Sequence, residues 1–144
     1  MKHLLMLLAV LSSAPAQTPF SSDSALSYLK TIALDIGPRP MGSPSERRAM
    51  AFGLAKFREF GLREVYMMKM NSAGGLNLSP SNTNSGIAVG VLRGKANRII
   101  VIGGHIDSAA PDVPGANDDG SGSAVVLELA RVLSKEQLQS TVVF

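Results

Sequence analysis

The chain has 144 residues, 45% of them hydrophobic and 17% charged, and its formal net charge is +3 at neutral pH. This length allows one domain of modest size and leaves no room for two. The basic residues form no run that could follow a phosphate backbone, so the sequence does not predict nucleic acid as a partner.

The first sixteen residues have the pattern of a signal peptide. A basic start is followed by an apolar run over 4–11 and by the small residues Ala14 and Ala16, which suit cleavage directly after residue 16. The apolar run is far shorter than the ~20 residues that a membrane span requires. We therefore expect 1–16 to be a signal peptide, although a buried N-terminal helix is the alternative. Because the chain has no cysteine, the expected location is a bacterial periplasm or the extracellular medium.

The first helix of the mature chain is predicted to begin at Ser22 or Asp23, either of which can cap it, and to run through Leu34. The helical spacing of its apolar residues predicts a buried side made of Leu26, Leu29, Ile32 and Ala33. The Gly-Pro-Arg-Pro segment at 37–40 then ends this helix.

A second helix is predicted from the capping box at 43–46, which places a proline at the first helical position. Its apolar side includes Met50, Leu54 and Phe57, and Gly61 ends it. Residues 64–70 are typical of a strand whose methionines pack in the interior. Residues 71–85 are rich in Asn, Ser and Gly and predict a loop, either a solvated connector or the border of a cleft.

The remaining elements are two strands, a helix and the start of a third strand. Residues 87–92 form a strand, and the short segment 93–97 predicts antiparallel pairing with the β-branched run at 98–104. That run has turn residues on both sides and is typical of a fully buried strand. Residues 121–135 form a helix, and 141–144 begin another strand. The apolar stripe of that helix is predicted to be Val125, Val126, Leu129, Val132 and Leu133. Together these elements predict an α/β fold with a mixed sheet.

Residues that could hold a metal ion stand at both ends of the loop before the last helix. His105 follows a strand, at the edge of the sheet where ligands bind in open α/β folds. Asp107 can accept the ring N–H that His105 does not use, and so orient the ring. Asp118 and Asp119 lie among glycines at the mouth of the helix, where short side chains can be turned inward. Two aspartates would repel a phosphate, so a cation, zinc first, is the favoured ligand.

Each half of this pattern also has an ordinary structural interpretation. A His-x-Asp pair can be a polar contact at a strand end, and Asp-Asp-Gly-Ser-Gly can cap a helix. The two ligand types converge from the ends of one loop, with glycines framing both, which favours a metal site. Taken alone, the residues leave both interpretations open.

Two segments, 103–108 and 114–122, resemble the co-catalytic zinc aminopeptidases. That family includes bacterial leucyl aminopeptidases, glutamate carboxypeptidase and, with one zinc, the glutaminyl cyclases. Residues 36–43 also resemble the Gly-Pro-Arg segment that precedes the first long helix of many members, so the resemblance extends over about residues 24–144. It implies a three-layer α/β/α sandwich with a mixed sheet, of the zinc-exopeptidase type and incomplete in this chain.

The resemblance also implies a role for each polar residue of the loop. By this resemblance, His105 would ligate one zinc ion and Asp118 would bridge two. Asp107 would support His105 by contacting its ring without touching the metal. The bond between Asp118 and Asp119 would be a cis peptide. Family members continue into a Glu-Glu pair, a further acidic residue and a final His, and none of these is in the sequence. The general base is therefore expected to be absent, and 17–144 to be the N-terminal part of a truncated catalytic domain.

The function that the resemblance implies is an exported zinc-dependent exopeptidase, which would hydrolyse a peptide or amino-acyl substrate with a metal-activated water and two zinc ions per complete domain. This chain alone is expected to be inactive. A glutaminyl cyclase-like zinc acyltransferase is one alternative, since it would share His105 and Asp118. A non-catalytic peptidase-like binding module is the other, although retention of both residues argues against it.

Overall fold

The computed structural model describes residues 18–69 and 86–144. The predicted signal peptide at 1–16 and the predicted loop at 71–85 lie outside the described residues. In the part of the chain that is described, no helix is both long and apolar enough to span a bilayer.

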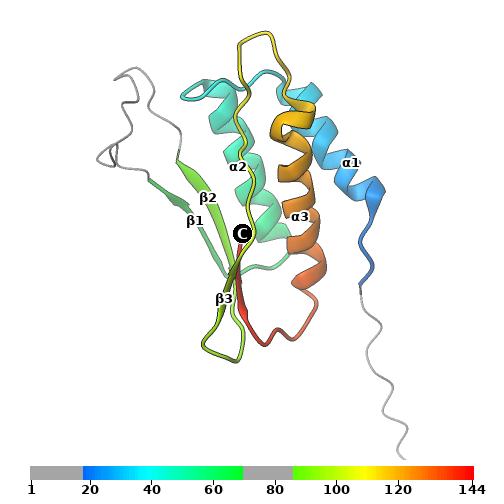
Figure 1. The fold of residues 1–144 in the computed structure, drawn as a ribbon, viewed down its shortest axis with the longest axis vertical. Helices are drawn as coiled ribbons and strands as arrows, with labels where there is room; N and C mark the ends of the chain where they lie inside the picture. The colour runs from blue at the N-terminus through cyan, green and yellow to red at the C-terminus, as the bar shows by residue number, and fades with distance from the viewer. Residues whose placement is uncertain (1–17, 70–85) are drawn as a thin grey trace, which may run out of the picture.

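Four strands form one mixed sheet, and the helices gather on one side of it (Figure 1). The strands are β1 (Glu64–Met68), β2 (Ile87–Leu92), β3 (Ile99–Val101) and β4 (Thr141–Val143), in the order β1-β2-β4-β3. The pairs β1–β2 and β2–β4 are antiparallel, whereas β3 and β4 are parallel. The predicted α/β fold with a mixed sheet is therefore confirmed.

The predicted pairing of β2 with β3 is wrong, because β4 lies between them. The connecting segment at 93–97 is held to the stretch before β4 instead. The amides of Lys95 and Ala96 donate to the carbonyls of Leu138 and Gln139, at 3.2 and 2.7 Å. The connection therefore opens wide enough to admit a third strand from far along the chain.

The strand β3 is exposed, although its β-branched sequence predicts a fully buried strand. Ile99, Ile100 and Val101 are 67%, 50% and 74% exposed. The reason is position, because β3 lies at the edge of the sheet and pairs only with β4 among the described residues. Apolar strand sequences indicate burial only when a neighbour or a helix covers them.

The first helix, α1 (Ser22–Lys30), continues into a wider turn, η1 (Thr31–Ile36). Its cap is Ser21, one residue before the predicted position, and the Ser21 hydroxyl accepts a hydrogen bond from the amide of Ser24 at 3.1 Å. The helical segment continues past the predicted end at Leu34 to Ile36, but its winding widens from Thr31 onward.

The buried side of α1 differs from the predicted one at two positions. Leu26 is 60% exposed, and Tyr28 is buried in its place, whereas Ile32 and Ala33 are buried as predicted. Because α1 packs mainly against the later helix α3 (Ser121–Leu133), that helix decides which of its residues are covered.

The second helix, α2 (Pro44–Glu59), begins as the capping box predicts. The hydroxyl of Ser43 accepts from the amide of Glu46 at 3.0 Å, and a proline occupies the first turn. The Glu46 carboxylate accepts from the amide of Gly42 at 2.7 Å, which extends the cap by one residue. Among the predicted apolar residues, Leu54 and Phe57 are buried and Met50 is half-buried.

The predicted apolar stripe of α3 is wrong in part. Val125 is 42% exposed, while Ala124, Leu127 and Ala130 are buried. Val126, Leu129 and Leu133 are partly buried and pack against the same cluster. Because α1, α2 and the turn η2 (Ala116–Gly120) all contact α3, its buried face is wider than one stripe and is centred on Leu127.

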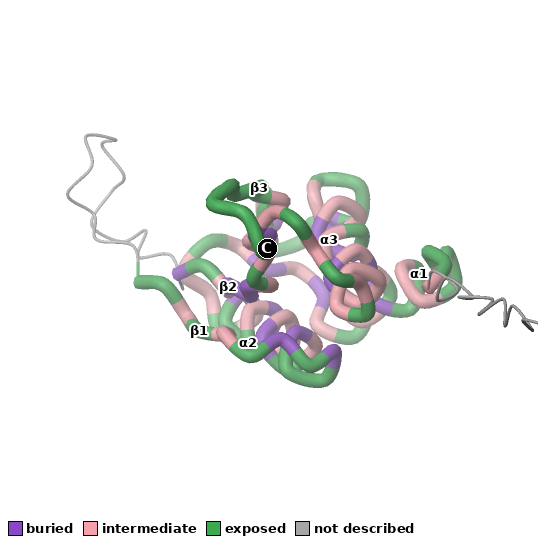
Figure 2. Tube along the Cα trace, turned by 90° about the horizontal axis from the view of Figure 1, so that it is seen from below, coloured by how far each residue is buried: buried purple, intermediate pink, exposed green. Residues whose placement is uncertain are grey.

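The core lies between the helices and the sheet, where Figure 2 shows the buried residues concentrated. The Phe57 and Phe144 rings lie 6.1 Å apart, as do the Tyr28 and Phe60 rings. Helix α2 approaches β2 so closely at Gly90 that a Cβ atom there would lie 2.8 Å from Cγ of Phe57. The hydrophobic core thus fixes α2 and α3 against the sheet whose carboxyl edge carries His105.

Candidate metal centre

His105 follows β3 at the carboxyl edge of the sheet, and its backbone is tied to α3. Its carbonyl accepts a hydrogen bond from the hydroxyl of Ser123 at 2.9 Å. Because Ser123 is buried in the first turn of α3, this bond fixes the backbone of His105 relative to the start of that helix. No pattern in the sequence marks Ser123 as part of the site.

The structure brings together the three residues that the sequence predicts for the site. The Nδ1 atom of His105 lies 3.1 Å from Oδ1 of Asp107, and its Nε2 atom lies 3.0 Å from Oδ1 of Asp118. The His105 side chain is 52% exposed and that of Asp118 77%, so the far side of the pair faces solvent. The ring therefore lies between two carboxylates, as a metal ligand and its orienting partner would be arranged. The roles of these residues as ligands stay a prediction.

The two carboxylates change the protonation of the ring. Partial burial lowers the pKa of His105, but the hydrogen bonds to Asp118 and Asp107 raise it by more, so the net pKa is above its usual value of 6.5. Without a metal, both ring nitrogens can donate only as an imidazolium. A divalent cation between Nε2 and Asp118 would take the place of one proton and leave the other on Nδ1, facing Asp107.

The separation of the two inner donors fits a zinc ion. Zinc binds imidazole nitrogen and carboxylate oxygen at ~2.0–2.2 Å in a tetrahedral arrangement, which places two such donors about 3.4 Å apart. The 3.0 Å between Nε2 of His105 and Oδ1 of Asp118 is shorter than that by only about 0.4 Å. The donor set and its geometry therefore fit zinc.

Asp119 has a different place from its neighbour. Its Oδ1 atom accepts a hydrogen bond from the amide of Gly122 at 3.1 Å, so this carboxylate caps the start of α3. The peptide bond between Asp118 and Asp119 is cis, as the resemblance implies. Both aspartates belong to the kinked turn η2 (Ala116–Gly120), in which their φ and ψ angles are not helical. The two adjacent aspartates therefore differ in role, because Asp119 caps a helix and Asp118 is a candidate ligand.

Comparison with known proteins agrees with this geometry. Residues 88–144, which contain His105 and Asp118, match the model of one protein family. That family is peptidase family M28. The sequence resemblance to the zinc aminopeptidases is thereby confirmed, and we refer to 88–144 as the M28 segment.

One relative and two solved structures illustrate the similarity. A "Probable zinc metalloprotease" of Pyrenophora teres f. teres is 52% identical over 54 residues, which are 33% of this chain and 11% of the relative. A leucine aminopeptidase precursor of Bacteroides thetaiotaomicron superimposes with a TM-score of 0.70 at 22% identity, over 89% of this chain and 47% of that chain. The glutaminyl cyclase of Porphyromonas gingivalis gives a TM-score of 0.66 at 25% identity, over 87% and 45%. The chain thus spans about half the length of these solved structures.

The candidate metal centre in the M28 segment is incomplete among the described residues. Within 18–69 and 86–144, no group of three or more His, Asp or Glu side chains is placed to hold a metal ion. A structural or catalytic zinc site uses three or four protein ligands. His105 and Asp118 are therefore two candidate ligands of a site that needs further ones.

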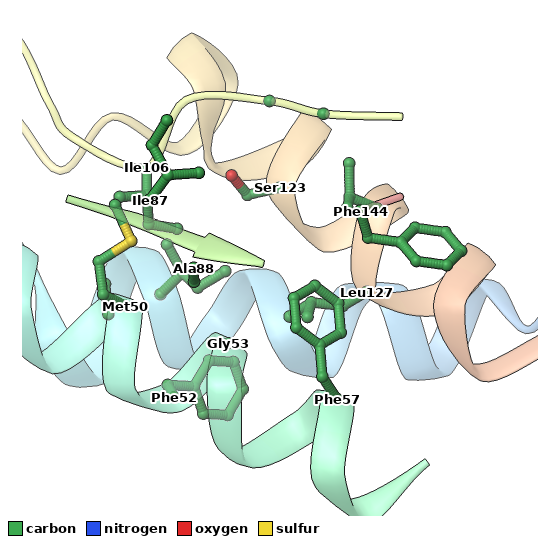
Figure 3. A pocket seen from close by; sticks show the side chains of 15 residues that line it. Met50, Phe52, Gly53, Phe57, Ile87, Ala88, Ile106, Ser123, Leu127 and Phe144 are labelled. Atoms are coloured by element: carbon green, nitrogen blue, oxygen red, sulfur yellow. The ribbon is translucent and has the colours of Figure 1, made fainter. Parts of the chain in front are cut away.

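An apolar cavity of about 110 Å³ lies beside the start of the loop that carries His105, between α2, α3 and β2 (Figure 3). Gly103 and Gly104, which directly precede His105, form part of its wall. Its lining includes Met50, Phe57 and Phe144, and Ser123 is the one polar side chain among the described residues that line it. Because the Ser123 hydroxyl proton is already donated to His105 and the rest of the described lining is apolar, this cavity suits an apolar occupant.

Proposed function

We propose that this chain is the N-terminal part of an exported zinc-dependent exopeptidase. The single observation that carries the proposal is the pair formed by Nε2 of His105 and Oδ1 of Asp118 at a separation suited to zinc. The match of 88–144 to peptidase family M28 supports it, as do relatives named as zinc metalloproteases and aminopeptidases. The signal-peptide pattern at 1–16 supports export to the periplasm or the medium.

Each residue of the site has a role in this proposal. When bound, zinc supplies Lewis acidity toward the scissile carbonyl and toward the attacking water. His105 would donate Nε2 to one ion, and the exposed Asp118 carboxylate has room to bridge a second. Asp107 would keep the Nδ1 proton, hold the ring in one orientation and raise the basicity of Nε2.

The 144-residue chain by itself is proposed to lack peptidase activity. Only two candidate ligands lie together among the described residues, and hydrolysis also needs a general base close to the attacking water. Peptide turnover would therefore require groups beyond those that the M28 segment supplies.

Glutaminyl cyclase-like acyl transfer is the second candidate. The specific observation in its favour is the similarity to the Porphyromonas gingivalis glutaminyl cyclase, at a TM-score of 0.66 and 25% identity. It predicts the same use of His105 and Asp118, so zinc binding alone does not separate it from a peptidase. A non-catalytic binding module, in contrast, predicts that zinc binding is indifferent to both residues.

The proposal is tested by zinc binding to the purified chain, measured by isothermal titration calorimetry. The chain contains two histidines, so all samples carry His3→Ala, which leaves His105 as the sole imidazole. In that background, His105→Ala and Asp118→Asn should each weaken zinc binding by at least about tenfold, and Asp107→Asn by 10–100-fold. The matched control is Asp112→Asn, an exposed carboxylate of the same loop, which should leave the affinity unchanged. Equal affinities for the control and for His105→Ala would contradict the proposal.

A further inference from the structure

Arg39 is a completely buried cation that has no carboxylate partner among the described residues. Its relative exposure is 0%, and it forms no salt bridge in that part of the chain. Instead its guanidinium donates five hydrogen bonds of 2.6–3.1 Å to backbone carbonyls. The five acceptors are the carbonyls of Ile32, Gly37, Ile106, Pro114 and Gly115.

Three of these carbonyls belong to the loop that carries the candidate metal ligands. Ile106, whose carbonyl accepts from Nε at 2.7 Å, lies between His105 and Asp107. Pro114 and Gly115 accept at 2.6 and 3.1 Å and directly precede the turn η2 that carries Asp118. One planar guanidinium therefore holds both ends of the loop.

The geometry at Gly115 shows how closely the loop is wrapped around this group. Gly115 has a φ of +58°, and a Cβ atom there would lie 3.2 Å from Nη2 of Arg39. The carbonyl of Gly115 also accepts from the amide of Gly120 at 3.0 Å, which closes the turn that contains Asp118. The same carbonyl thus links the guanidinium to the turn of the ligand.

The backbone of Arg39 makes a second connection to the loop. Its amide donates to the Ser108 hydroxyl at 2.8 Å, and its carbonyl accepts from the Ser108 amide at 3.0 Å. Ser108 is itself buried. The connection between the segment before α2 and the loop at 105–118 therefore has both a side-chain and a backbone part.

The chemistry of this arrangement requires arginine. Burying a charge is unfavourable unless polar groups surround it, and here five carbonyl dipoles do so. Burial lowers the pKa of the Arg39 guanidinium by more than the nearby charge of Asp107 raises it, so the net pKa lies below its usual value. A lysine has three donors on one atom and no planar fork, so it cannot reach carbonyls in three separate segments.

We propose that Arg39 is a positioning residue for the candidate metal centre, which fixes the loop at 105–118 so that His105 and Asp118 face each other at a separation close to the one that zinc requires. This inference rests on the proposed function. It assigns Arg39 no contact with metal or substrate, because each of its three guanidinium nitrogens already donates to a backbone carbonyl.

The first arm of the test measures the loop without metal. Hydrogen exchange is compared between the wild type and Arg39→Lys, which keeps the positive charge and loses the planar guanidinium. The amides of Ser108 and Gly120 should exchange at least about tenfold faster in the variant, whereas the Gly90 amide in the sheet should not change. Uniform acceleration, or none, would overturn the proposal.

The second arm measures zinc affinity by calorimetry in a double-mutant cycle, with His3→Ala in every sample. Arg39→Lys should weaken zinc binding on the order of tenfold when His105 is present, and should have no further effect in the His105→Ala background. The control Arg131→Lys alters a buried ion pair on the outer part of α3 and should leave zinc affinity unchanged. An unchanged affinity in Arg39→Lys, or the same loss with and without His105, would overturn the positioning role.

The two arms separate the possible failures. If the loop amides exchange faster in Arg39→Lys but zinc binding does not depend on His105, the proposed function is refuted, and the positioning role with it. Zinc binding that depends on His105 but not on Arg39 would refute the positioning role alone. If Arg39→Lys does not fold, Ser108→Ala removes one bond of the same connection and leaves the guanidinium in place. Ser108→Ala should produce the same two changes, faster amide exchange in the loop and weaker zinc binding, at smaller size. The absence of these changes would overturn the proposal.

Discussion

Glu128 offers a sharp test of how the N-terminal helix is held to the fold. It lies in α3 and is 0% exposed, yet it carries a charge. Its carboxylate accepts from the amide of Ser21 at 2.6 Å and from Nε of Arg131 at 2.8 Å. Arg131 in turn donates to the carbonyl of Pro19 at 2.9 Å. We predict that Glu128→Gln, which keeps the shape and removes the charge, destabilises the whole domain.

The size of the effect follows from these contacts. Removing one partner of a buried ion pair costs ~3–5 kcal/mol, because it leaves the other charge uncompensated. Arg131 is 24% exposed and keeps its bond to Pro19, so the loss belongs at the low end of this range. We expect the free energy of unfolding to fall by about 3 kcal/mol.

The assay is urea unfolding at pH 7, with Glu59→Gln as the matched control. Glu59 also forms an i,i+3 pair with a cation, Lys56, but is exposed, so its loss should cost less than about 1 kcal/mol. Equal losses for the two variants would refute the interpretation of Glu128 as a buried anchor.

The pH dependence gives an independent check on Glu128. Its hydrogen bond to Arg131 lowers the pKa of the carboxyl below 4.5, and the Ser21 amide acts in the same direction. In the unfolded chain the carboxyl binds its proton at higher pH than in the folded chain. The contribution of Glu128 is therefore complete above about pH 5 and is lost as the pH falls through the folded pKa. The stability difference between wild type and Glu128→Gln should shrink over that interval.

Three further predictions concern the core, a helix cap and export. Gly90→Ala would place a Cβ atom 2.7 Å from Cδ2 of Leu62, and the resulting overpacking should lower the unfolding free energy by about 1–3 kcal/mol in urea melts. Ser43→Ala removes the hydroxyl that caps α2 and should cost about 1 kcal/mol in thermal unfolding, whereas Ser45→Ala in the same turn should cost less. Expressed in an export-competent bacterium, the chain should begin at Gln17 by mass spectrometry, and an intact Met1 on the soluble protein would count against a signal peptide.

Local signals in the sequence were sufficient for several elements. The capping box at Ser43 predicts the start of α2, and the apolar run at 87–92 predicts β2 with its observed bounds. The position of His105 and Asp118 was also predictable. A strand end and the following helix start meet at one edge of an α/β sheet, so the two residues converge whatever the remaining topology.

The parts that could not be predicted depend on contacts distant in the sequence. The insertion of β4 between β2 and β3 brings residue 142 beside residue 92, which the short connection at 93–97 cannot indicate. The buried face of α3 depends on three neighbours at once, so one helical stripe of apolar residues could not define it. Arg39 contacts carbonyls 67 and 76 residues away. The resemblance at 36–43 drew attention to Arg39, but it did not indicate which groups Arg39 would hydrogen-bond.

The central claim is that His105 and Asp118 hold zinc, and X-ray absorption at the zinc edge of the His3→Ala chain tests it most directly. With His3 replaced, the sequence retains one imidazole, that of His105. We expect the zinc complex to show the outer-shell scattering of a single imidazole together with oxygen ligands at ~2.0–2.2 Å. The imidazole signal should disappear in the His105→Ala variant, and the oxygen shell should change in Asp118→Asn. A zinc spectrum without imidazole scattering in the His3→Ala chain would contradict the account.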